Sequence, residues 1–176
     1  ASKLASDLRE RERVLRKRHP QAEGVDRHPV PAPLRGSKER SLSIGFYVNW
    51  DDNSYPALKR ALPHLDWVIP SWISLEGANL ELKAEVDDRV LKLIQETKPN
   101  VPILPMIQNA VEGKWDGAGL ARLLANPEAR TARIDDIVSF LQSNKFQGLT
   151  VDFEELPAVA QKDLRDFLSE LSSALT

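Results

Sequence analysis

Apolar residues alternate between short continuous runs and helical stripes from about residue 43 to the C-terminus. Four of the runs predict strands, over residues 44–50, 66–75, 101–108 and 148–154. After each run, apolar residues recur every three or four positions, which predicts a helix. A strand followed by a helix, repeated four times, indicates an α/β fold with a parallel sheet and right-handed crossovers.

The predicted helices begin with cap residues and carry apolar stripes. Ser54 is placed to cap the first helix, with Pro56 in its first turn. Asn126 and Pro127 begin a longer helix, and residues 120–124 form a short one before it. The stripes expected to face the core are Leu58, Ala61 and Leu62; Val86, Val90, Leu93 and Ile94; Ile134, Ile137, Val138 and Leu141; and Leu164, Phe167, Leu168, Leu171 and Leu175.

Prolines and turn residues interrupt this pattern at three places. Pro70 removes a ladder donor from the middle of the second predicted strand, and the third strand also contains prolines. Residues 109–119 are expected to form a loop, because residues 114–117 carry a strong turn signal. The last strand runs directly into residues 155–157, where we expect the final helix to start.

Two architectures accommodate four such units. An eight-unit TIM-type (β/α)8 barrel needs about 250 residues, so residues 41–176 fit the N-terminal half of one. An open, doubly wound sheet is the alternative. Residues 49–53 stand where such a sheet would carry a glycine-rich phosphate loop, and they contain no glycine. The half-barrel is therefore the favoured fold.

Residues 1–40 differ from the rest of the chain. Basic residues crowd residues 9–18, and prolines are regularly spaced through residues 28–33. This composition predicts a charged N-terminal arm followed by an extended, proline-rich linker. A surface helix or tail is one interpretation of the arm, and a juxtamembrane or partner-binding segment is the other.

The overall composition narrows the function further. The 176 residues carry a net charge of −2 and no cysteine, which argues against nucleic acid as a partner, a disulfide framework and a thiolate metal site. His19, His28 and His64 lack the spacing of metal ligands. The sequence contains no recognisable membrane span or signal peptide. It begins with Ala1 rather than Met, which indicates a processed form or a fragment.

The candidate chemistry lies in residues 148–154. Side chains alternate along a strand, so Thr150, Asp152 and Glu154 share one face. Buried acids are costly unless they are used or paired. The Cα atoms of Asp152 and Glu154 should lie about 6–7 Å apart, and two carboxyls that close disfavour double ionisation. One acid kept protonated can serve as a general acid. The alternative is pairing with Arg or Lys, or capping of the next helix.

These residues resemble the fourth-strand signature of glycoside hydrolase family 18, the chitinase-like enzymes, whose pattern is D-G-x-D-x-D-x-E. In that pattern Glu154 falls on the general acid and Asp152 on the aspartate that orients the substrate's N-acetyl group. Gln147 and Thr150 replace the first two aspartates. Thr150 matters more, because the family's residue at this position shares a proton with the one at position 152.

The resemblance extends to residues 46–51, 66–70 and 104–109, which are similar to divergent family members. Those include spore-cortex-lysin-like proteins and the hydrolase-like domain fused to polysaccharide deacetylase and glycosyltransferase domains in bacterial envelope proteins. The resemblance implies substrate-assisted, retaining hydrolysis of an N-acetylglucosamine-containing polysaccharide, with no metal and no organic cofactor. It also implies a parent protein in the cell envelope or outside the cytoplasm, with membrane anchoring as one option.

Sugar sites usually contain aromatic platforms and amide side chains, and the chain has candidates for both. Each candidate competes with ordinary packing or turn formation. The residues predicted to bind substrate are Tyr47, Trp50, Trp72, Gln108, Asn109 and Trp115.

Three functions stay open at this point: a hydrolase domain, a glycan-binding domain that does not cut, and a structural or regulatory domain. A half-barrel lacks the wall that later strands provide, so we expect the isolated chain to be inactive. It also exposes two sheet edges, through which copies of the chain can associate.

Overall fold

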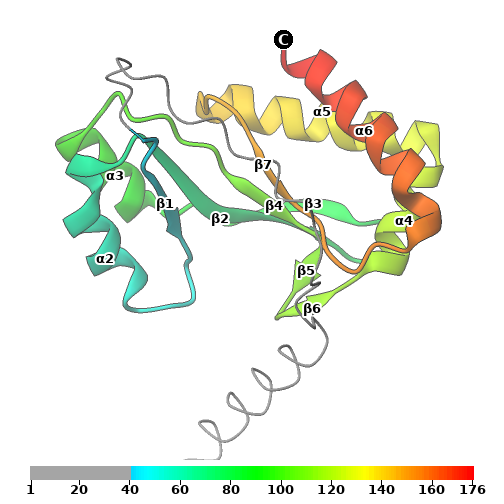
Figure 1. Cartoon of the computed structure of the whole chain (residues 1–176), viewed down its shortest axis with the longest axis horizontal. Helices are drawn as coiled ribbons and strands as arrows, with labels where there is room; N and C mark the ends of the chain where they lie inside the picture. The colour runs from blue at the N-terminus through cyan, green and yellow to red at the C-terminus, as the bar shows by residue number, and fades with distance from the viewer. Residues whose placement is uncertain (1–40) are drawn as a thin grey trace, which may run out of the picture. The chain divides into compact units, whose positions relative to one another are not determined.

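The computed structural model describes residues 41–176, and the predicted arm and linker in residues 1–40 lie outside this part. Neighbouring strands in its main parallel sheet follow the order of the chain without a reversal. A doubly wound sheet reverses its order at a switch point, whereas a barrel does not. The described residues thus form part of a TIM-type barrel (Figure 1). In sheet order the strands are β1 (Ile44–Tyr47), β2 (Trp67–Glu76), β4 (Met106–Gln108) and β7 (Thr150–Asp152).

Helices connect these strands. In Figure 1, α2 and α3 lie toward one end of the sheet and α4, α5 and α6 toward the other. None of the helices within residues 41–176 is long and apolar enough to cross a membrane. In chain order they are α2 (Ser54–Ala61), the short η1 (Leu62–His64), α3 (Asp88–Thr97), α4 (Gly117–Ala125), α5 (Pro127–Asn144), the short η2 (Ala158–Ala160) and α6 (Gln161–Leu175).

Two antiparallel pairings were not predicted. Strand β3 (Glu81–Ala84) pairs with the second half of β2, whose first half pairs with β1. Strands β5 (Ala110–Val111) and β6 (Lys114–Trp115) form a small hairpin where a loop was expected. Its turn residues Glu112 and Gly113 have φ values of 49° and 75°, so a left-handed turn closes the hairpin.

The strands are shorter than predicted where prolines fall. The third strand covers only Met106–Gln108 instead of residues 101–108, because Pro102 and Pro105 have no N–H to donate. Ile103 keeps a single bridge to Val68. Pro70 is accommodated within β2 because it pairs with Tyr47, where β1 ends.

Of three predictions about where and how helices begin, one is confirmed and two are wrong. The Asn126 side chain caps α5, accepting from the N–H groups of Glu128 and Ala129 at 3.0 and 3.2 Å. Ser54 does not cap α2, because its hydroxyl oxygen accepts from the N–H of Val48 at 3.0 Å. Helix α6 begins at Gln161, after η2, rather than directly after β7.

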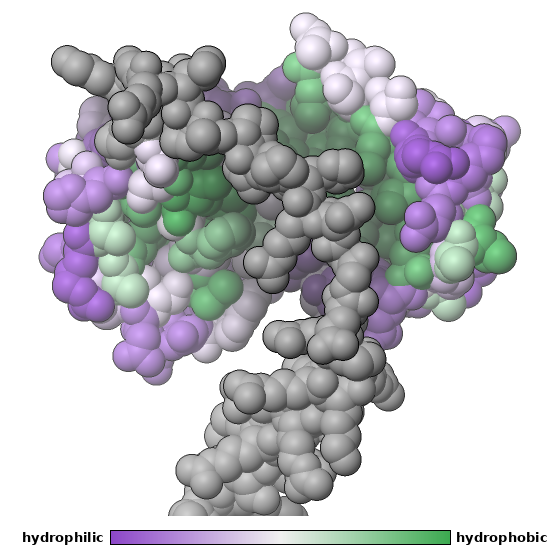
Figure 2. Space-filling view, in the orientation of Figure 1, coloured by the Kyte–Doolittle hydropathy of each residue, from purple (hydrophilic) through white to green (hydrophobic). Residues whose placement is uncertain are grey.

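The core lies between the sheet and the helices. Tyr47, Trp72 and Phe167 are among its largest buried side chains. In Figure 2, hydrophilic residues cover the outer helices and apolar residues are concentrated nearer the middle of the face. The inward stripe predicted for α6 is wrong at Leu168 and Leu175, which are exposed.

The other face of β1 is exposed. Ile44 and Phe46 point away from the buried Tyr47, and Phe46 is 62% exposed. Ile44 pairs in register with Trp67 of β2, which is also exposed. These residues occupy the face that a complete barrel would enclose, so the open half-barrel leaves apolar surface uncovered.

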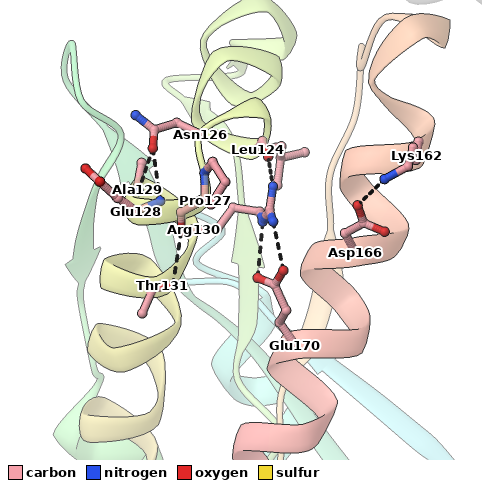
Figure 3. A network of polar contacts seen from close by, with 10 residues as sticks. All are labelled: Leu124, Asn126, Pro127, Glu128, Ala129, Arg130, Thr131, Lys162, Asp166 and Glu170. Carbon is pink, nitrogen blue, oxygen red and sulfur yellow. Dashed lines mark hydrogen bonds and ion pairs between the residues drawn. The ribbon is translucent and has the colours of Figure 1, made fainter.

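Helices α4, α5 and α6 are joined by one buried cation (Figure 3). Arg130 of α5 donates from Nε and Nη2 to the carboxylate of Glu170 on α6, at 3.1 and 2.8 Å. Its Nη1 donates to the carbonyl oxygen of Leu124 on α4 at 2.7 Å. The Glu170 hydrogen bond raises the pKa of Arg130. This contact supports the helices that flank β7.

Candidate active site

Two acids stand at the carboxyl end of β7. Asp152 is the last residue of the strand and is partly buried, whereas Glu154 lies two residues further and is exposed. Asp152 pairs in register with Gln108, the last residue of β4. The acids therefore lie at the edge of the sheet where barrel enzymes carry their active sites.

The Asp152 side chain is held by neighbouring strands. The amide nitrogen Nε2 of Gln108 donates to Oδ2 of Asp152 at 2.7 Å. The hydroxyl of Ser71, on β2, donates to Oε1 of the same Gln108 at 2.7 Å. Three strands thus contribute one residue each to a continuous polar chain that ends at Asp152.

The backbone of Glu154 is held by Asn109, which follows β4. Nδ2 of Asn109 donates to the carbonyl oxygen of Glu154 at 3.0 Å, and Oδ1 accepts from its N–H at 2.9 Å. Asn109 is 0% exposed. Its amide therefore contacts the Glu154 main chain and does not face solvent, unlike the sugar-binding position predicted from the sequence.

The Glu154 carboxylate itself is unengaged. Within residues 41–176 it has no hydrogen bond and no ion pair, and neither Glu154 nor Asp152 pairs with an Arg or Lys. The segment after it is closely packed: a Cβ on Gly117 would lie 1.8 Å from the carbonyl oxygen of Glu155. A fixed backbone with a free carboxylate is the arrangement that a proton donor to a bound ligand requires.

Thr150 does not contact Asp152 through its side chain. Its hydroxyl donates to the carbonyl oxygen of Leu104 at 3.3 Å. Its register partner is Met106, two positions before the Gln108–Asp152 pair. The contact to Asp152 that the family pattern expects from position 150 is made here by Gln108.

Two cavities, of about 380 and 540 Å³, open at this edge of the sheet. Trp50, Gln108 and Glu112 line both, and Trp115 lines the larger one. Trp50 is 71% exposed, so its indole presents a free face. The smaller cavity is also lined by the polar side chains of Ser71, Ser74, Glu76 and Glu85.

Tyr47 is buried on the helix side of the sheet. Its hydroxyl donates to Oδ2 of Asp87 at 2.6 Å, and Asp87 also accepts from Arg89 and caps α3. Burial and the Asp87 contact raise the pKa of Tyr47 to about 12. The hydrogen bond from Arg89, followed by that from Tyr47, lowers the pKa of Asp87 against the opposing effect of burial. Tyr47 thus links β1 to α3.

Trp72 borders the smaller cavity but is only 2% exposed. Its Nε1 donates to Oδ1 of Asn49 at 3.0 Å, and its ring packs against Phe146 with centroids 5.9 Å apart. The two buried aromatic residues Tyr47 and Trp72 therefore lie behind the site, whereas Trp50 and Trp115 lie at its rim.

Several residues of the site were not predicted. Ser71, Glu76, Glu85 and Glu112 line the cavities, and Glu112 is brought there by the β5–β6 hairpin. The available signal was Gly113 two residues after Val111, because glycine readily adopts the left-handed conformation of a tight hairpin turn. In the described part of the chain, no cluster of three His, Cys, Asp or Glu is arranged to hold a metal ion.

Comparisons with known proteins identify the fold. No family model and no curated protein sequence matches the chain. Among solved structures, the Bacillus cereus spore cortex-lytic enzyme SleL superposes with a TM-score of 0.70 over 80% of this chain, at 14% identity. A class V chitinase from Pseudomonas fluorescens gives 0.70 over 77%, at 17% identity. The family 18 chitinase from Cycas revoluta, in complex with (GlcNAc)3, gives 0.62 over 76%, at 18% identity.

The chain has the fold of part of a family 18 chitinase barrel. It spans 34% of the SleL structure, 42% of the Pseudomonas enzyme and 40% of the Cycas enzyme. These fractions agree with a partial barrel of four βα units.

Proposed function

Starting from a partial barrel of the family 18 chitinase type, we propose that these residues carry the acid-bearing half of a glycoside hydrolase domain that acts on N-acetylglucosamine-containing polysaccharide. The observation that carries the proposal is the free carboxylate of Glu154 on a backbone fixed by Asn109. It stands beside the anchored Asp152 at the carboxyl edge of a parallel sheet. Tryptophan-lined cavities at the same edge offer a surface for a sugar ring.

The mechanism is substrate-assisted and retains the anomeric configuration. Glu154 donates its proton to the glycosidic oxygen, and the C1–O bond breaks. The carbonyl oxygen of the substrate's own acetamide group forms a bond to C1 from the opposite face. Asp152 holds the acetamide in line for this attack. Water then attacks C1 and reopens the ring formed by the acetamide, while the Glu154 carboxylate accepts the proton of the water.

Trp50 and Trp115 provide the sugar platforms, because each lines the larger cavity and Trp50 has a free face. Gln108 lines both cavities and can reach a sugar hydroxyl from there. Tyr47, Trp72 and Asn109 are buried, so their part in substrate binding is to support the residues at the rim.

The isolated chain is inactive in this proposal. A barrel closes with eight strands, and the neighbouring structures are more than twice as long as the part that this chain spans. The uncovered edges and the exposed Phe46 of β1 favour association between copies of the isolated chain.

We propose further that the parent is a polysaccharide-processing protein of the cell envelope or the outside of the cytoplasm, that this barrel is one of its domains, and that membrane anchoring is one option for it. Support comes from the two SleL structures, whose names describe enzymes that lyse the spore cortex. The net charge of −2 of the whole chain argues against nucleic acid as a general partner.

A second function is a barrel that holds glycan without cutting it. It is favoured by one observation: the hydroxyl of Thr150 bonds to Leu104 and leaves Asp152 without the acidic neighbour of the family pattern. Both functions require the same glycan to bind, and only the hydrolase cleaves it.

The deciding experiment measures hydrolysis of N-acetylglucosamine oligomers by a longer polypeptide that completes the barrel, with the 176-residue chain alongside. We expect turnover by the longer form only, its loss in Glu154→Gln, and its retention in the matched control Glu155→Gln, which changes an exposed adjacent acid. Oligomers with a free amine in place of the reacting acetamide should resist cleavage. Binding that persists without turnover in any form would instead establish the glycan-holding function.

A further inference from the structure

The strongest unexplained contact of the site is the hydrogen bond from Gln108 to Asp152. We infer that Gln108 is the positioning residue for Asp152 and replaces, from the neighbouring strand, the aspartate that is absent at Thr150. The inference deepens the proposed hydrolase function and rests on it for its catalytic meaning. The structural part of the inference is that the Gln108 amide donates a hydrogen bond to the Asp152 carboxylate. This part can be tested in a chain that has no hydrolase activity.

The orientation of the Gln108 amide follows from its two partners. Oε1 is occupied by the hydroxyl of Ser71, so Nε2 is directed at Oδ2 of Asp152. The opposite orientation would place the oxygen of the amide against the carboxylate oxygen and lose a donor. The Asp152 carboxylate, which only accepts, therefore sets the orientation of the amide, and the Ser71 hydroxyl donates to the oxygen at its other end.

Backbone pairing brings the three residues together. Gln108 and Asp152 are register partners on β4 and β7, and Ser71 lies on β2 next to the register shift between Ser71 and Ile73. Because these residues belong to paired strands, the backbone of the sheet holds the hydrogen-bonded side chains of Ser71, Gln108 and Asp152 in place. Such a support holds a catalytic side chain more firmly than a loop would.

Thr150 is excluded as the partner of Asp152 by its own contacts. Its N–H donates to the carbonyl oxygen of Pro105 at 2.9 Å, and its hydroxyl bonds to Leu104. Both contacts lie toward the beginning of the strand, away from the Gln108–Asp152 pair. Gln108 is the side chain that reaches the Asp152 carboxylate.

The replacement changes the chemistry of the pair. Two neighbouring carboxyls share a proton and titrate as a coupled pair, whereas the amide of glutamine has no proton to lose in water. Gln108 therefore donates to Asp152 at every working pH, and the orientation of Asp152 does not depend on a shared proton.

The other charged groups near this pair are acidic. Glu154 follows Asp152 on the same segment, and Glu76, Glu85 and Glu112 line the cavity that Gln108 also lines. No Lys or Arg belongs to the lining of either tryptophan-bordered cavity. A neutral donor beside Asp152 thus avoids adding another negative charge to an already acidic site.

The test follows the carboxyl carbon of Asp152 by NMR in the isotope-labelled 176-residue chain, with Asp152→Asn to assign the signal. In the unaltered chain we expect the side-chain N–H signals of Gln108 to move together with the Asp152 carboxyl signal as the pH changes, because the two groups are hydrogen-bonded. In Gln108→Glu, a second carboxyl replaces the amide donor, so the pH dependence of the Asp152 signal should differ from that of the unaltered chain. The matched control Gln161→Glu adds the same charge at the exposed start of α6 and should leave the curve unchanged.

The inference is overturned if the Gln108 amide signals do not respond to Asp152 in the unaltered chain, a result that needs no altered Gln108 to fold. It is also overturned if folded Gln108→Glu and the unaltered chain give the same Asp152 curve. In a longer, active form, Gln108→Glu should shift the acid limb of the pH–rate profile upward, and Gln161→Glu should not. If the Gln108 and Asp152 signals respond to each other but no form hydrolyses the oligomers, the contact is upheld and the hydrolase function is rejected. If the signals do not respond to each other but hydrolysis depends on Glu154, the hydrolase function is upheld and the role of Gln108 is rejected.

Discussion

The side-chain amide of Asn109 hydrogen-bonds both main-chain groups of Glu154, donating to the carbonyl oxygen at 3.0 Å and accepting from the N–H at 2.9 Å. Both partners belong to segments that follow strands of the same sheet, 45 residues apart in sequence. Each group would otherwise lack a ladder partner beyond the end of β7, so the buried amide completes the backbone bonding of this segment.

Replacement of Asn109 by Leu should free the Glu154 segment. Two buried hydrogen bonds are lost, which should lower the free energy of unfolding by about 2 kcal/mol and speed exchange of the Glu154 amide hydrogen roughly tenfold or more. Hydrogen exchange measured by NMR checks this. The control Asn144→Leu removes an exposed amide that bonds Phe140 within α5 and should leave Glu154 exchange unaltered. Unchanged Glu154 exchange in Asn109→Leu would contradict the contact.

The Tyr47–Asp87 contact should make stability fall at alkaline pH. The folded state raises the pKa of Tyr47 to about 12, above the ordinary value of about 10, so the unfolded chain loses its proton first. The stabilisation is complete below pH 10 and is lost as the pH rises toward 12. Urea unfolding followed across this range should show a smaller decline for Tyr47→Phe than for the unaltered chain. Equal declines would show that Tyr47 does not contribute.

Glu170 and Asp166, one turn apart on α6, should differ in their importance. Glu170 binds the buried Arg130 through two hydrogen bonds, whereas Asp166 pairs with the exposed Lys162. Glu170→Ala should lower the free energy of unfolding by about 2 kcal/mol, because it leaves a buried guanidinium with fewer partners. Asp166→Ala, the matched control, should have a much smaller effect. Chemical denaturation of both variants measures these changes. Equal losses of stability in the two variants would show that the contacts between Arg130 and Glu170 do not stabilise α6.

Trp50 should contribute to glycan binding without contributing to stability. Its ring is 71% exposed and lines both cavities. Loss of a stacking face worth about 0.5–1.5 kcal/mol predicts roughly two- to twelvefold weaker binding of an N-acetylglucosamine oligomer by Trp50→Ala, with an unchanged melting temperature. Calorimetric titration of the barrel-completing form measures this. Trp67 lies outside both cavities and provides the comparison variant Trp67→Ala, whose affinity should be unchanged.

The isolated chain should self-associate through the exposed face of β1. Phe46 is 62% exposed on an open strand edge, so Phe46→Lys should shift sedimentation toward the monomer. Val159, which is 89% exposed on η2, gives the control Val159→Lys with the same change of charge. A monomer in the unaltered chain, or an equal response to both substitutions, would count against an interface at this edge.

Much of the fold could be predicted from local patterns. The alternating run over residues 148–154, of which Thr150–Asp152 form β7, and the cap at Asn126 each depend on residues close together in sequence. The order of strands then follows from the handedness of crossovers. The predictions were weaker where one residue has two possible partners: Ser54 bonds the end of β1 instead of capping α2, a choice that depends on where Val48 lies in space.

The site was harder to predict because its polar contacts cross strands. Gln108 and Asp152 are 44 residues apart, and the sequence alone does not show that their side chains meet. The exposure of aromatic residues is also a tertiary property, which is why Tyr47 and Trp72 could not be separated from Trp50 beforehand. The sequence pattern identified the residues whose side chains could bind a sugar. Only the packed structure shows which of them lie at the rim of the cavities and which are buried behind it.

The two hydrogen bonds from Asn109 reach only the main chain at position 154, so they do not depend on which side chain stands there. A substitution of Glu154 would remove the acid and leave the bend of the chain in place. In the proposed hydrolase, a single substitution at position 154 would therefore end catalysis and leave the proposed glycan-binding surface folded. The hydrogen bonds that fix the acid would then also preserve a barrel that binds glycan without cutting it.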